Sequence, residues 1–183
     1  MKGFVRSDQL FSLCGLNCGL CTMRLGGYCP GCGGGEGNQS CAIARCSLDH
    51  GGVEYCFQCG EFPCGRYENE DVYDSFITHR NRLRDLERAR QSGVEVYQAE
   101  QRERCEILRV LLEGYNDGRR KTLFSLAANL LELEDLREIL ERLTGEASGL
   151  PERAGRAAAL CKEAAARRGV DLRLRKPPGK SGK

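Results

Sequence analysis

Ten cysteines crowd into one segment of this 183-residue chain and limit what that segment can fold into. They lie between residues 14 and 64, and only Cys105 and Cys161 lie outside that stretch. Residues 1–65 also hold 14 of the 23 glycines and few large apolar side chains. Such a segment cannot bury enough apolar surface to offset its conformational entropy. We therefore expect the cysteines to cross-link it.

Metal ions, rather than disulfides, are the cross-link that the rest of the sequence favours. The N-terminal residues include Asp8 and Gln9 and show no apolar run long enough for a signal peptide. No stretch approaches the roughly 20 apolar residues that span a membrane. We therefore expect a cytoplasmic protein without a membrane partner. In that compartment thiols stay reduced, and dense cysteine binds metal more often than it forms disulfides.

Three pairs of these cysteines have the C-x2-C spacing, at residues 18 and 21, 29 and 32, and 56 and 59. Two residues between thiolates let both sulfurs reach one ion at about 2.3 Å. Two of the pairs run into glycine, as CPGCG and CFQCG. Glycine can take the positive φ that lets backbone N–H groups point at sulfur. Two such knuckles joined by an irregular loop indicate a four-thiolate site.

Ten thiols divide into two four-thiolate sites with two thiols to spare. One arrangement pairs the two knuckles in a single site made of Cys29, Cys32, Cys56 and Cys59. The other arrangement builds a local site from Cys29, Cys32, Cys41 and Cys46. Its second site takes Cys14, Cys18 and Cys21 and is completed by Cys56, Cys59 or Cys64. The sequence leaves both arrangements open.

Sites made only of thiolate suit zinc and iron–sulfur clusters alike. We expect two zinc ions, because a closed four-thiolate site has no position for a substrate and so argues for structure. Zinc binding would supply roughly 10–16 kcal/mol per site, which is folding energy for a segment with little core. The stretch CGLNCGLC, residues 14–21, also matches the cysteine spacing of radical iron–sulfur enzymes. That motif normally opens a long strand–helix barrel, and no repeat of strand and helix is present here.

The two histidines and the two outlying cysteines have simpler interpretations. His50 follows Cys46 closely, and we interpret it as a polar loop residue, with an extra metal ligand as the alternative. His79 lies on an apolar helical stripe and is expected to pack half-buried. Cys105 and Cys161 fall within helical patterns, where we expect them to be buried as small apolar residues.

Beyond about residue 68 the sequence changes to a helical period. One apolar stripe, ended by a glycine at residue 93, predicts a helix through Val72, Phe76, His79, Leu83 and Leu86. Further stripes and end signals predict helices at about 94–115, 121–131, 133–143 and 151–169. Residues 170–174 alternate apolar and charged side chains, which predicts one short strand.

The expected fold is a small metal-stabilised irregular N-terminal module followed by an all-α region of about four to five helices. The module covers residues 1–66, the helical region covers 67–175, and 176–183 form a disordered basic tail. From residue 152 to the end there are ten Lys or Arg against three acidic residues. This asymmetry permits an anionic partner such as nucleic acid. We interpret it as a solvated terminus.

The cysteine pattern resembles a family of prokaryotic proteins, domain of unknown function 3795. The similar stretches are CGLNCGLC, CPGCG and CAIARCSLDHGGVEYCFQCGEFPC, followed by HRNRLRDLERARQSGVEVYQAEQ and NDGRRKTLFSLAANLLELEDLREIL. The likeness covers nearly the whole chain and implies a zinc-binding protein without an assigned activity. It implies ten metal-ligand candidates: Cys14, Cys18, Cys21, Cys29, Cys32, Cys41, Cys46, Cys56, Cys59 and Cys64.

We interpret the chain as a zinc-binding module whose metals are mainly structural and which displays a surface to a partner such as another protein. Two histidines and no recognisable nucleophile–base pair leave little for hydrolytic or acyl-transfer chemistry. An iron–sulfur redox protein and a nucleic-acid-binding zinc protein are the alternatives. Against the latter, aromatic residues are sparse and the knuckles are flanked by Glu36, Glu54 and Glu61.

Overall fold

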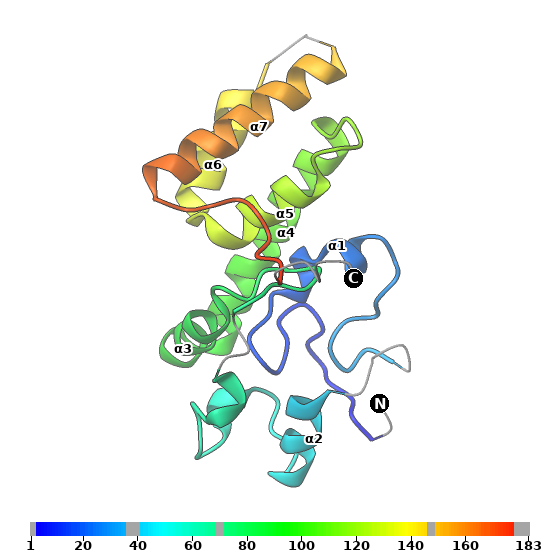
Figure 1. Ribbon diagram of the computed structural model, residues 1–183, viewed down its shortest axis with the longest axis vertical. Helices are drawn as coiled ribbons and strands as arrows, with labels where there is room; N and C mark the ends of the chain where they lie inside the picture. Colours follow the sequence, from blue (N-terminus) through cyan, green and yellow to red (C-terminus); the bar gives the residue numbers. More distant parts are fainter. Residues whose placement is uncertain (1–2, 36–40, 69–71, 146–148, 178–183) are drawn as a thin grey trace, which may run out of the picture.

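The computed structural model describes residues 3–35, 41–68, 72–145 and 149–177. Within these ranges the chain forms seven α-helices and three short 3-10 turns, and it contains no strand. An irregular N-terminal part with two short helices precedes five longer helices (Figure 1), as the sequence predicts. None of the described helices has the length and apolar character needed to cross a membrane. Most of the expected disordered tail, residues 178–183, lies outside the described residues.

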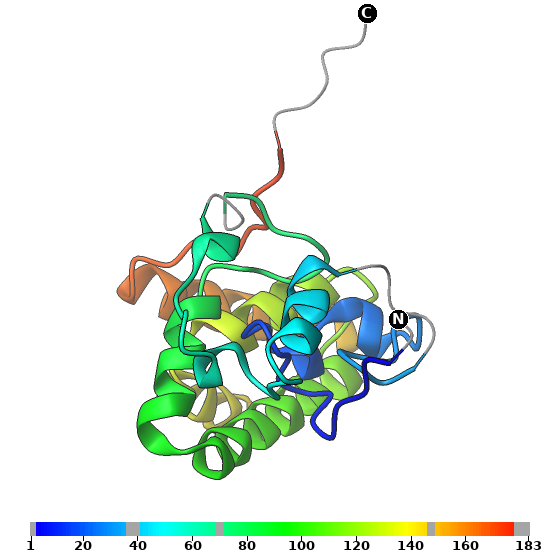
Figure 2. The ribbon, with the colours of Figure 1, turned by 90° about the horizontal axis from the view of Figure 1, so that it is seen from below.

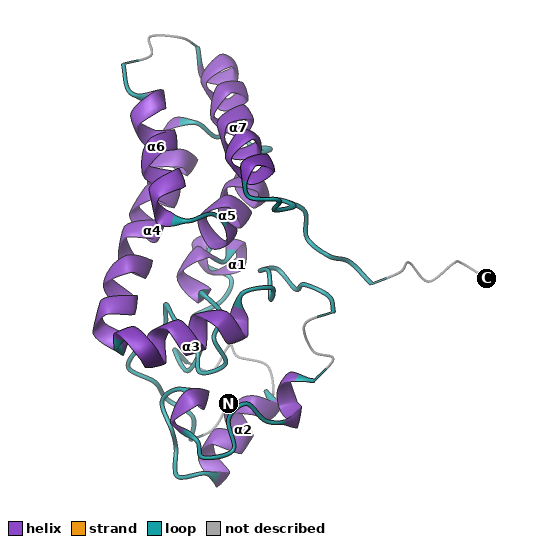
Figure 3. Ribbon diagram, turned by 90° about the vertical axis from the view of Figure 1, so that its left-hand side faces the viewer, coloured by secondary structure: helices purple, strands orange, loops and turns teal. Residues whose placement is uncertain are grey.

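Four helices form a stack that is visible at the top of Figures 1 and 3: α4 (Val94–Gly114), α5 (Lys121–Leu130), α6 (Leu133–Leu143) and α7 (Leu150–Arg167). Their bounds agree with the predicted helices. Local chemistry explains the starts of two of them. Glu132 and Asp135 form a capping box at the first turn of α6, and Pro151 occupies the first turn of α7. The inward faces of the stack meet in one apolar core, which includes Leu108, Leu111, Phe124, Leu136, Ile139 and Ala157.

The helix predicted from about residue 68 begins later than expected, and that prediction is wrong for residues 72–81. α3 spans Arg82–Ser92 and ends at Gly93, which has φ 89°. Val72 and Phe76 are exposed rather than aligned on a buried stripe. The reason is the side chain of Asp74. It accepts hydrogen bonds from the backbone N–H of His79 at 2.9 Å and from the guanidinium of Arg175 in the C-terminal segment. These bonds hold the segment in a turn. His79 is half-buried, as predicted.

The strand predicted at residues 170–174 is also wrong, because the described part of this segment is irregular. Its carbonyl groups are used by a side chain: the Arg80 guanidinium donates to the backbone oxygens of Asp171 and Arg173. Val170 and Leu172 pack against the helical core. The alternating pattern therefore reflects an extended segment lying over the stack, without a neighbouring strand to pair with.

The cysteine-rich part has five short regular elements among its described residues: α1 (Thr22–Leu25), α2 (Ala42–Asp49) and the turns η1 (Cys18–Leu20), η2 (Cys56–Gln58) and η3 (Gly65–Tyr67). α2 lies beyond α3, at the opposite end of the molecule from α7, whereas α1 lies beside α5 (Figures 1 and 3). We call residues 3–67 the cysteine-rich module. Its own apolar cluster is small and consists of Phe4, Leu13, Ile43 and Ala44.

The module and the helices share buried apolar side chains as well as polar contacts. Figure 2, seen from below, shows the N-terminal segments in blue and cyan in front of the helices. Leu20 of the module is fully buried in the core of the stack, and its carbonyl accepts a 2.6 Å hydrogen bond from Ser125 of α5. A second cluster joins three aromatic rings of the module to α3 and α4, through Phe11, Tyr55, Tyr67, Leu86, Ala89 and Tyr97. Burial therefore continues across the predicted boundary at residue 66.

Candidate metal centre

Four cysteines line one small cavity at the outer end of the module. Its volume is about 30 Å³, which is enough to hold a water molecule or an ion. Apolar side chains, including Ile43, Val53 and Phe62, form part of the remaining wall. We call its cysteines the second cysteine group: Cys46, Cys56, Cys59 and Cys64. They come from α2, from the two ends of η2 and from the residue before η3.

Five other cysteines lie nearer the helices and form the first cysteine group: Cys14, Cys18, Cys21, Cys29 and Cys32. The thiol of Cys18 is at their centre, since the charges of the other four all act on it. Burial raises the pKa of the Cys18 thiol far above its usual range, and those neighbours raise it further. A neutral thiol is therefore favoured there until a cation arrives.

The CPGCG knuckle of the first group has the backbone geometry that the sequence predicts. Gly31 and Gly33 have φ of 90° and 77°, and the Gly31 N–H donates to the sulfur of Cys29 at 3.5 Å. Such N–H groups stabilise thiolate charge. The CFQCG knuckle differs, because Gly60 does not adopt a positive φ. Instead Cys56 and Cys59 bracket a 3-10 turn, with the Cys59 N–H donating to the Cys56 carbonyl at 3.0 Å.

Arg6 is a residue of this site that sequence reasoning missed. It is 4% exposed, and its guanidinium donates to the backbone oxygens of Asp8 and Phe11 at 2.9 Å and of Glu54 at 3.0 Å. It also faces Cys32, where burial raises the pKa of the thiol and the Arg6 charge opposes that rise. Arg6 thus joins the N-terminal segment to the first group. Sequence reasoning missed it because Glu54 and Cys32, which tie it to the site, are distant in the chain.

Two of the predicted ligands, Cys14 and Cys41, differ from the others in position. Cys14 lies between the groups: its charge acts on Cys18 and also on Cys56 of the second group. Its sulfur is 3.3 Å from the Ser12 hydroxyl. Cys41 is exposed at the N-terminal cap of α2 and does not line the cavity of the second group. The described cysteines of this segment thus fall into a first group of five that includes Cys14, a second group of four, and Cys41 outside both.

The grouping differs from both predicted arrangements. The first arrangement joins the knuckle of Cys29 and Cys32 to that of Cys56 and Cys59, but these knuckles lie in different groups. The second arrangement places Cys46 with Cys29, whereas Cys46 lines the cavity with Cys56. Among the described residues, no three His, Cys, Asp or Glu side chains already stand where they could hold an ion. Binding would therefore require thiols to turn toward a common centre.

The rim of the second group carries charged and ionisable side chains. His50, which follows α2, has Nδ1 3.6 Å from the sulfur of Cys46 and Nε2 3.5 Å from a carboxylate oxygen of Glu61. The Cys46 carbonyl and the Glu61 carboxylate raise the pKa of His50. Arg66 also lines the cavity, and the neighbouring Cys46 thiolate raises its pKa. The structure thus places His50 beside a cysteine group, and its i, i+4 spacing from Cys46 was the available signal.

The stretch CGLNCGLC also carries the contacts that seat the module on the helices. The side chain of Asn17 is buried, donates to Asp85 of α3 at 2.8 Å and accepts from the Tyr97 hydroxyl of α4 at 3.2 Å. Gly15 has φ 89°, and a Cβ there would collide with the Arg82 carbonyl and lie 2.8 Å from a carbon of Leu86. The non-cysteine residues of this stretch therefore form the joint with α3.

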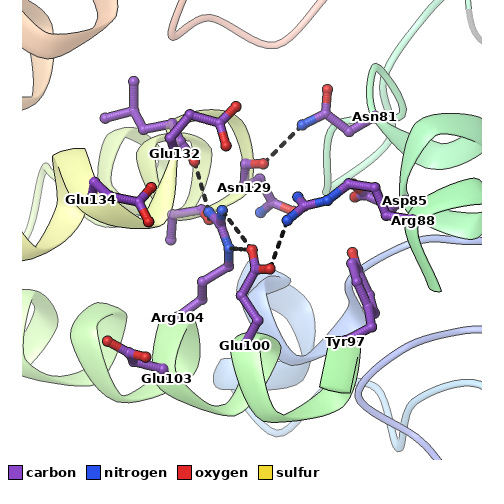
Figure 4. Close-up of polar contacts among 12 residues, drawn as sticks. Asn81, Asp85, Arg88, Tyr97, Glu100, Glu103, Arg104, Asn129, Glu132 and Glu134 are labelled. Carbon is purple, nitrogen blue, oxygen red and sulfur yellow. Dashed lines mark hydrogen bonds and ion pairs between the residues drawn. The ribbon is translucent and has the colours of Figure 1, made fainter. Parts of the chain in front are cut away.

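Further polar contacts around this joint are shown in Figure 4. Glu100 of α4 accepts from Arg88 of α3 at 2.6 Å and from Arg104 at 2.9 Å, and Arg104 also donates to two carbonyls at the end of α5. Burial raises the pKa of Asp85 to about 6. These groups bond to one another and to the backbone, so the cluster fixes helices rather than offering a reactive side chain.

Thiols are the donor groups that this arrangement would offer to a soft metal ion. Burial raises the pKa of Cys56 to about 12, so an ion would have to displace a proton from that thiol. Cys161 is fully buried, as predicted, whereas Cys105 is only half-buried against the stack. No family model, curated protein or solved structure matches this chain.

Proposed function

We propose that this chain is a zinc-binding protein whose cysteine-rich module holds two ions for structure, and that it belongs to the family of domain of unknown function 3795. The observation that carries the proposal is the convergence of four cysteines on one cavity of about 30 Å³. The first ion would be held by cysteines of the first group and the second by cysteines of the second group. Both donor sets are rich in the thiolates that zinc prefers.

Zinc is favoured over an iron–sulfur cluster because the module has only a small apolar cluster of its own, and a closed thiolate zinc site supplies folding energy to such a segment. The cavity of the second group has room for an ion among its thiols.

The role as an interaction module, with a protein as the partner, is supported by the pairing of the basic C-terminal segment. Four of its arginines form ion pairs within the fold: Arg167 with Glu138, Arg168 with Asp135, Arg173 with Asp171, and Arg175 with Asp74. Charges that are paired in this way attract phosphate groups less strongly. This pairing weighs against nucleic acid as the partner.

The test is metal analysis together with an optical spectrum of protein purified without oxygen. We expect two zinc ions per chain and no visible absorbance, because zinc has no d-electron transitions. Iron with acid-labile sulfide and a broad band near roughly 400 nm would contradict the proposal and indicate redox chemistry. A chain free of bound metal after reconstitution with zinc would contradict it as well.

A further inference from the structure

We infer that His50 is a metal ligand of the second cysteine group, binding through Nδ1 beside Cys46. The inference rests on the proposed metal module and gives one of its two sites a mixed thiolate–imidazole character. Cys46 lies in the last turn of α2 (Ala42–Asp49), and His50 is the residue that ends the helix. Residues four apart lie on one face of a helix, so both side chains approach the same point.

The distance between the two donor atoms fits a shared ion. The sulfur of Cys46 and Nδ1 of His50 are 3.6 Å apart. In a tetrahedral zinc site, a thiolate at about 2.3 Å and an imidazole nitrogen at about 2.0–2.1 Å stand about 3.5 Å from each other. These two ligands therefore need little adjustment, whereas the other thiols of the cavity must turn inward. A pair placed in this way would be the first to capture an ion.

The second ring nitrogen of His50 has the partner that a metal-bound histidine requires. Nε2 is 3.5 Å from Oε1 of Glu61, and both residues line the cavity of the second cysteine group. A metal-bound histidine usually donates its other N–H to a carboxylate or carbonyl, which fixes the ring and its tautomer. At present Nδ1 is also 2.8 Å from the Cys46 carbonyl, and that contact would give way to the ion.

The ligand set then has one donor more than a tetrahedral ion accepts. The cavity presents four thiols and one imidazole, and zinc takes four of them. Replacing a thiolate by neutral imidazole lowers the negative charge of the site by one. His50 and Glu61 are exposed, so the mixed site faces solvent, unlike the first group with its buried Cys21. We expect its ion to exchange faster than the other.

The experiment is a Co²⁺ titration of the reduced, chelator-treated full chain, comparing the original sequence with His50→Asn and His79→Asn. Cobalt reports the number of thiolates through its d–d bands and its sulfur-to-metal charge-transfer absorbance. His79 is the control, because it is the other histidine and its Nε2 bonds to Ser75, away from the cysteines. We expect His50→Asn to change the spectrum of one bound ion only and to lower the affinity of the protein for that ion by at least about tenfold. His79→Asn should change neither ion.

The outcomes separate this inference from the proposed function. Two bound Co²⁺ ions whose spectra are unchanged in His50→Asn would overturn the role of His50 and leave the metal module intact. Failure of the original chain to bind any Co²⁺ or Zn²⁺ would overturn both. An equal loss of Co²⁺ affinity in His79→Asn would show a general effect of histidine removal and would also overturn the inference.

Glu61→Gln should lower the affinity for the same ion that His50→Asn affects.

Discussion

The helical stack and the cysteine-rich module fill their interiors with different side chains. α5 alone buries Phe124, Leu126 and Leu130 among its ten residues. The described residues of the module bury fewer for their length: Phe4, Phe11, Leu13, Leu20, Ile43, Tyr55 and Tyr67. Of these, Leu20 lies in the core of the stack, and the three aromatic rings Phe11, Tyr55 and Tyr67 share a cluster with α3 and α4. Apolar burial therefore accounts for the stack, whereas the module needs another source of stability.

Cysteine supplies much of the interior that the module has. Cys14, Cys32 and Cys56 pack against its small cluster around Phe4 and Leu13. A thiol is small and weakly polar, so these contacts contribute modestly on their own. The same side chains would contribute far more as ligands of the proposed ions, since a structural zinc site is worth roughly 10–16 kcal/mol. The comparison predicts that changes to cysteine affect the two regions unequally.

The largest effect is expected from Cys56→Ser, which removes a thiol from the second cysteine group. The variant should bind one of the two proposed ions much more weakly, because serine is a poor zinc ligand and only three thiols and His50 then remain in that group. Part of the roughly 10–16 kcal/mol that a structural zinc site supplies is lost with Cys56. Hydrogen exchange should then accelerate in residues 41–67 and remain slow in α5 to α7. Metal content and exchange measured by mass spectrometry test this. Cys29→Ser should act in the same way on the first group.

The matched control is Cys161→Ser, in the fully buried face of α7. A buried hydroxyl without a partner costs about 1–3 kcal/mol of unfolding free energy, and no ligand is removed. The protein should therefore keep both ions while its stack becomes less stable. Metal loss in Cys161→Ser together with full metal content in Cys56→Ser would reverse the assignment of ligands.

Much of the helical stack could be predicted from the sequence, because its signals are local. α4 to α7 follow apolar stripes with nearby start and stop residues, such as Pro151 and Gly145. The start of α3 could not be predicted, because Asp74 is held by Arg175, which is 101 residues away in the chain. The same long-range contacts turn the expected strand at 170–174 into an irregular segment.

For the candidate site, the sequence names the residue types that could bind metal, and this remains a prediction, whereas the way in which they are grouped is visible only in the folded chain. The C-x2-C turns form locally, and Gly31 and Gly33 have the positive φ expected of them. Grouping depends instead on how loops pack, for example through buried Arg6, whose partner Glu54 is 48 residues away. His50 was interpreted as a loop residue because its neighbour Glu61 becomes visible only in the folded chain.

A smaller effect is expected from Leu20→Ala, which tests whether the module and the stack unfold together. Leu20 belongs to the module but is fully buried in the core of the stack. Truncating a buried leucine costs about 2–5 kcal/mol, so the free energy of unfolding should fall by that amount. Urea unfolding followed by circular dichroism, which reports the helices, measures it. Leu25→Ala is the control, because that side chain is 42% exposed and should change stability little.

Gly15→Ala tests the joint itself and should cost about 3 kcal/mol. Part of this is backbone strain of about 1–2 kcal/mol at φ 89°, and the rest is the collision of the new methyl group with α3. Gly118→Ala is the matched control, because Gly118 has the same φ and nothing within 4 Å of the added carbon. The two variants should differ by about 1–3 kcal/mol in urea unfolding. Equal losses would show that the joint is loosely packed.

The smallest effect is a pH dependence that arises at the same joint. Asp85 is 3% exposed, and burial raises its pKa to about 6, although Arg84 and Asn17 oppose the shift. In the unfolded chain this carboxyl titrates near its ordinary value of about 3.9. A pKa that is raised on folding means that the neutral acid is favoured in the folded state. The free energy by which Asp85 stabilises the fold is therefore fully present below about pH 4 and is lost as the pH rises through about 6.

Asp85→Asn isolates this contribution, because asparagine is uncharged at every pH and can still accept a hydrogen bond from Asn17. The difference in unfolding free energy between the original chain and the variant should change by about 1 kcal/mol between pH 5 and pH 7. The original chain should be the one that loses stability as the pH rises. Metal release on acidification affects both proteins alike, so it cancels in the difference. A difference in unfolding free energy that does not change with pH would mean that Asp85 stays ionised at the joint. The charge of Arg84 would then outweigh the effect of burial.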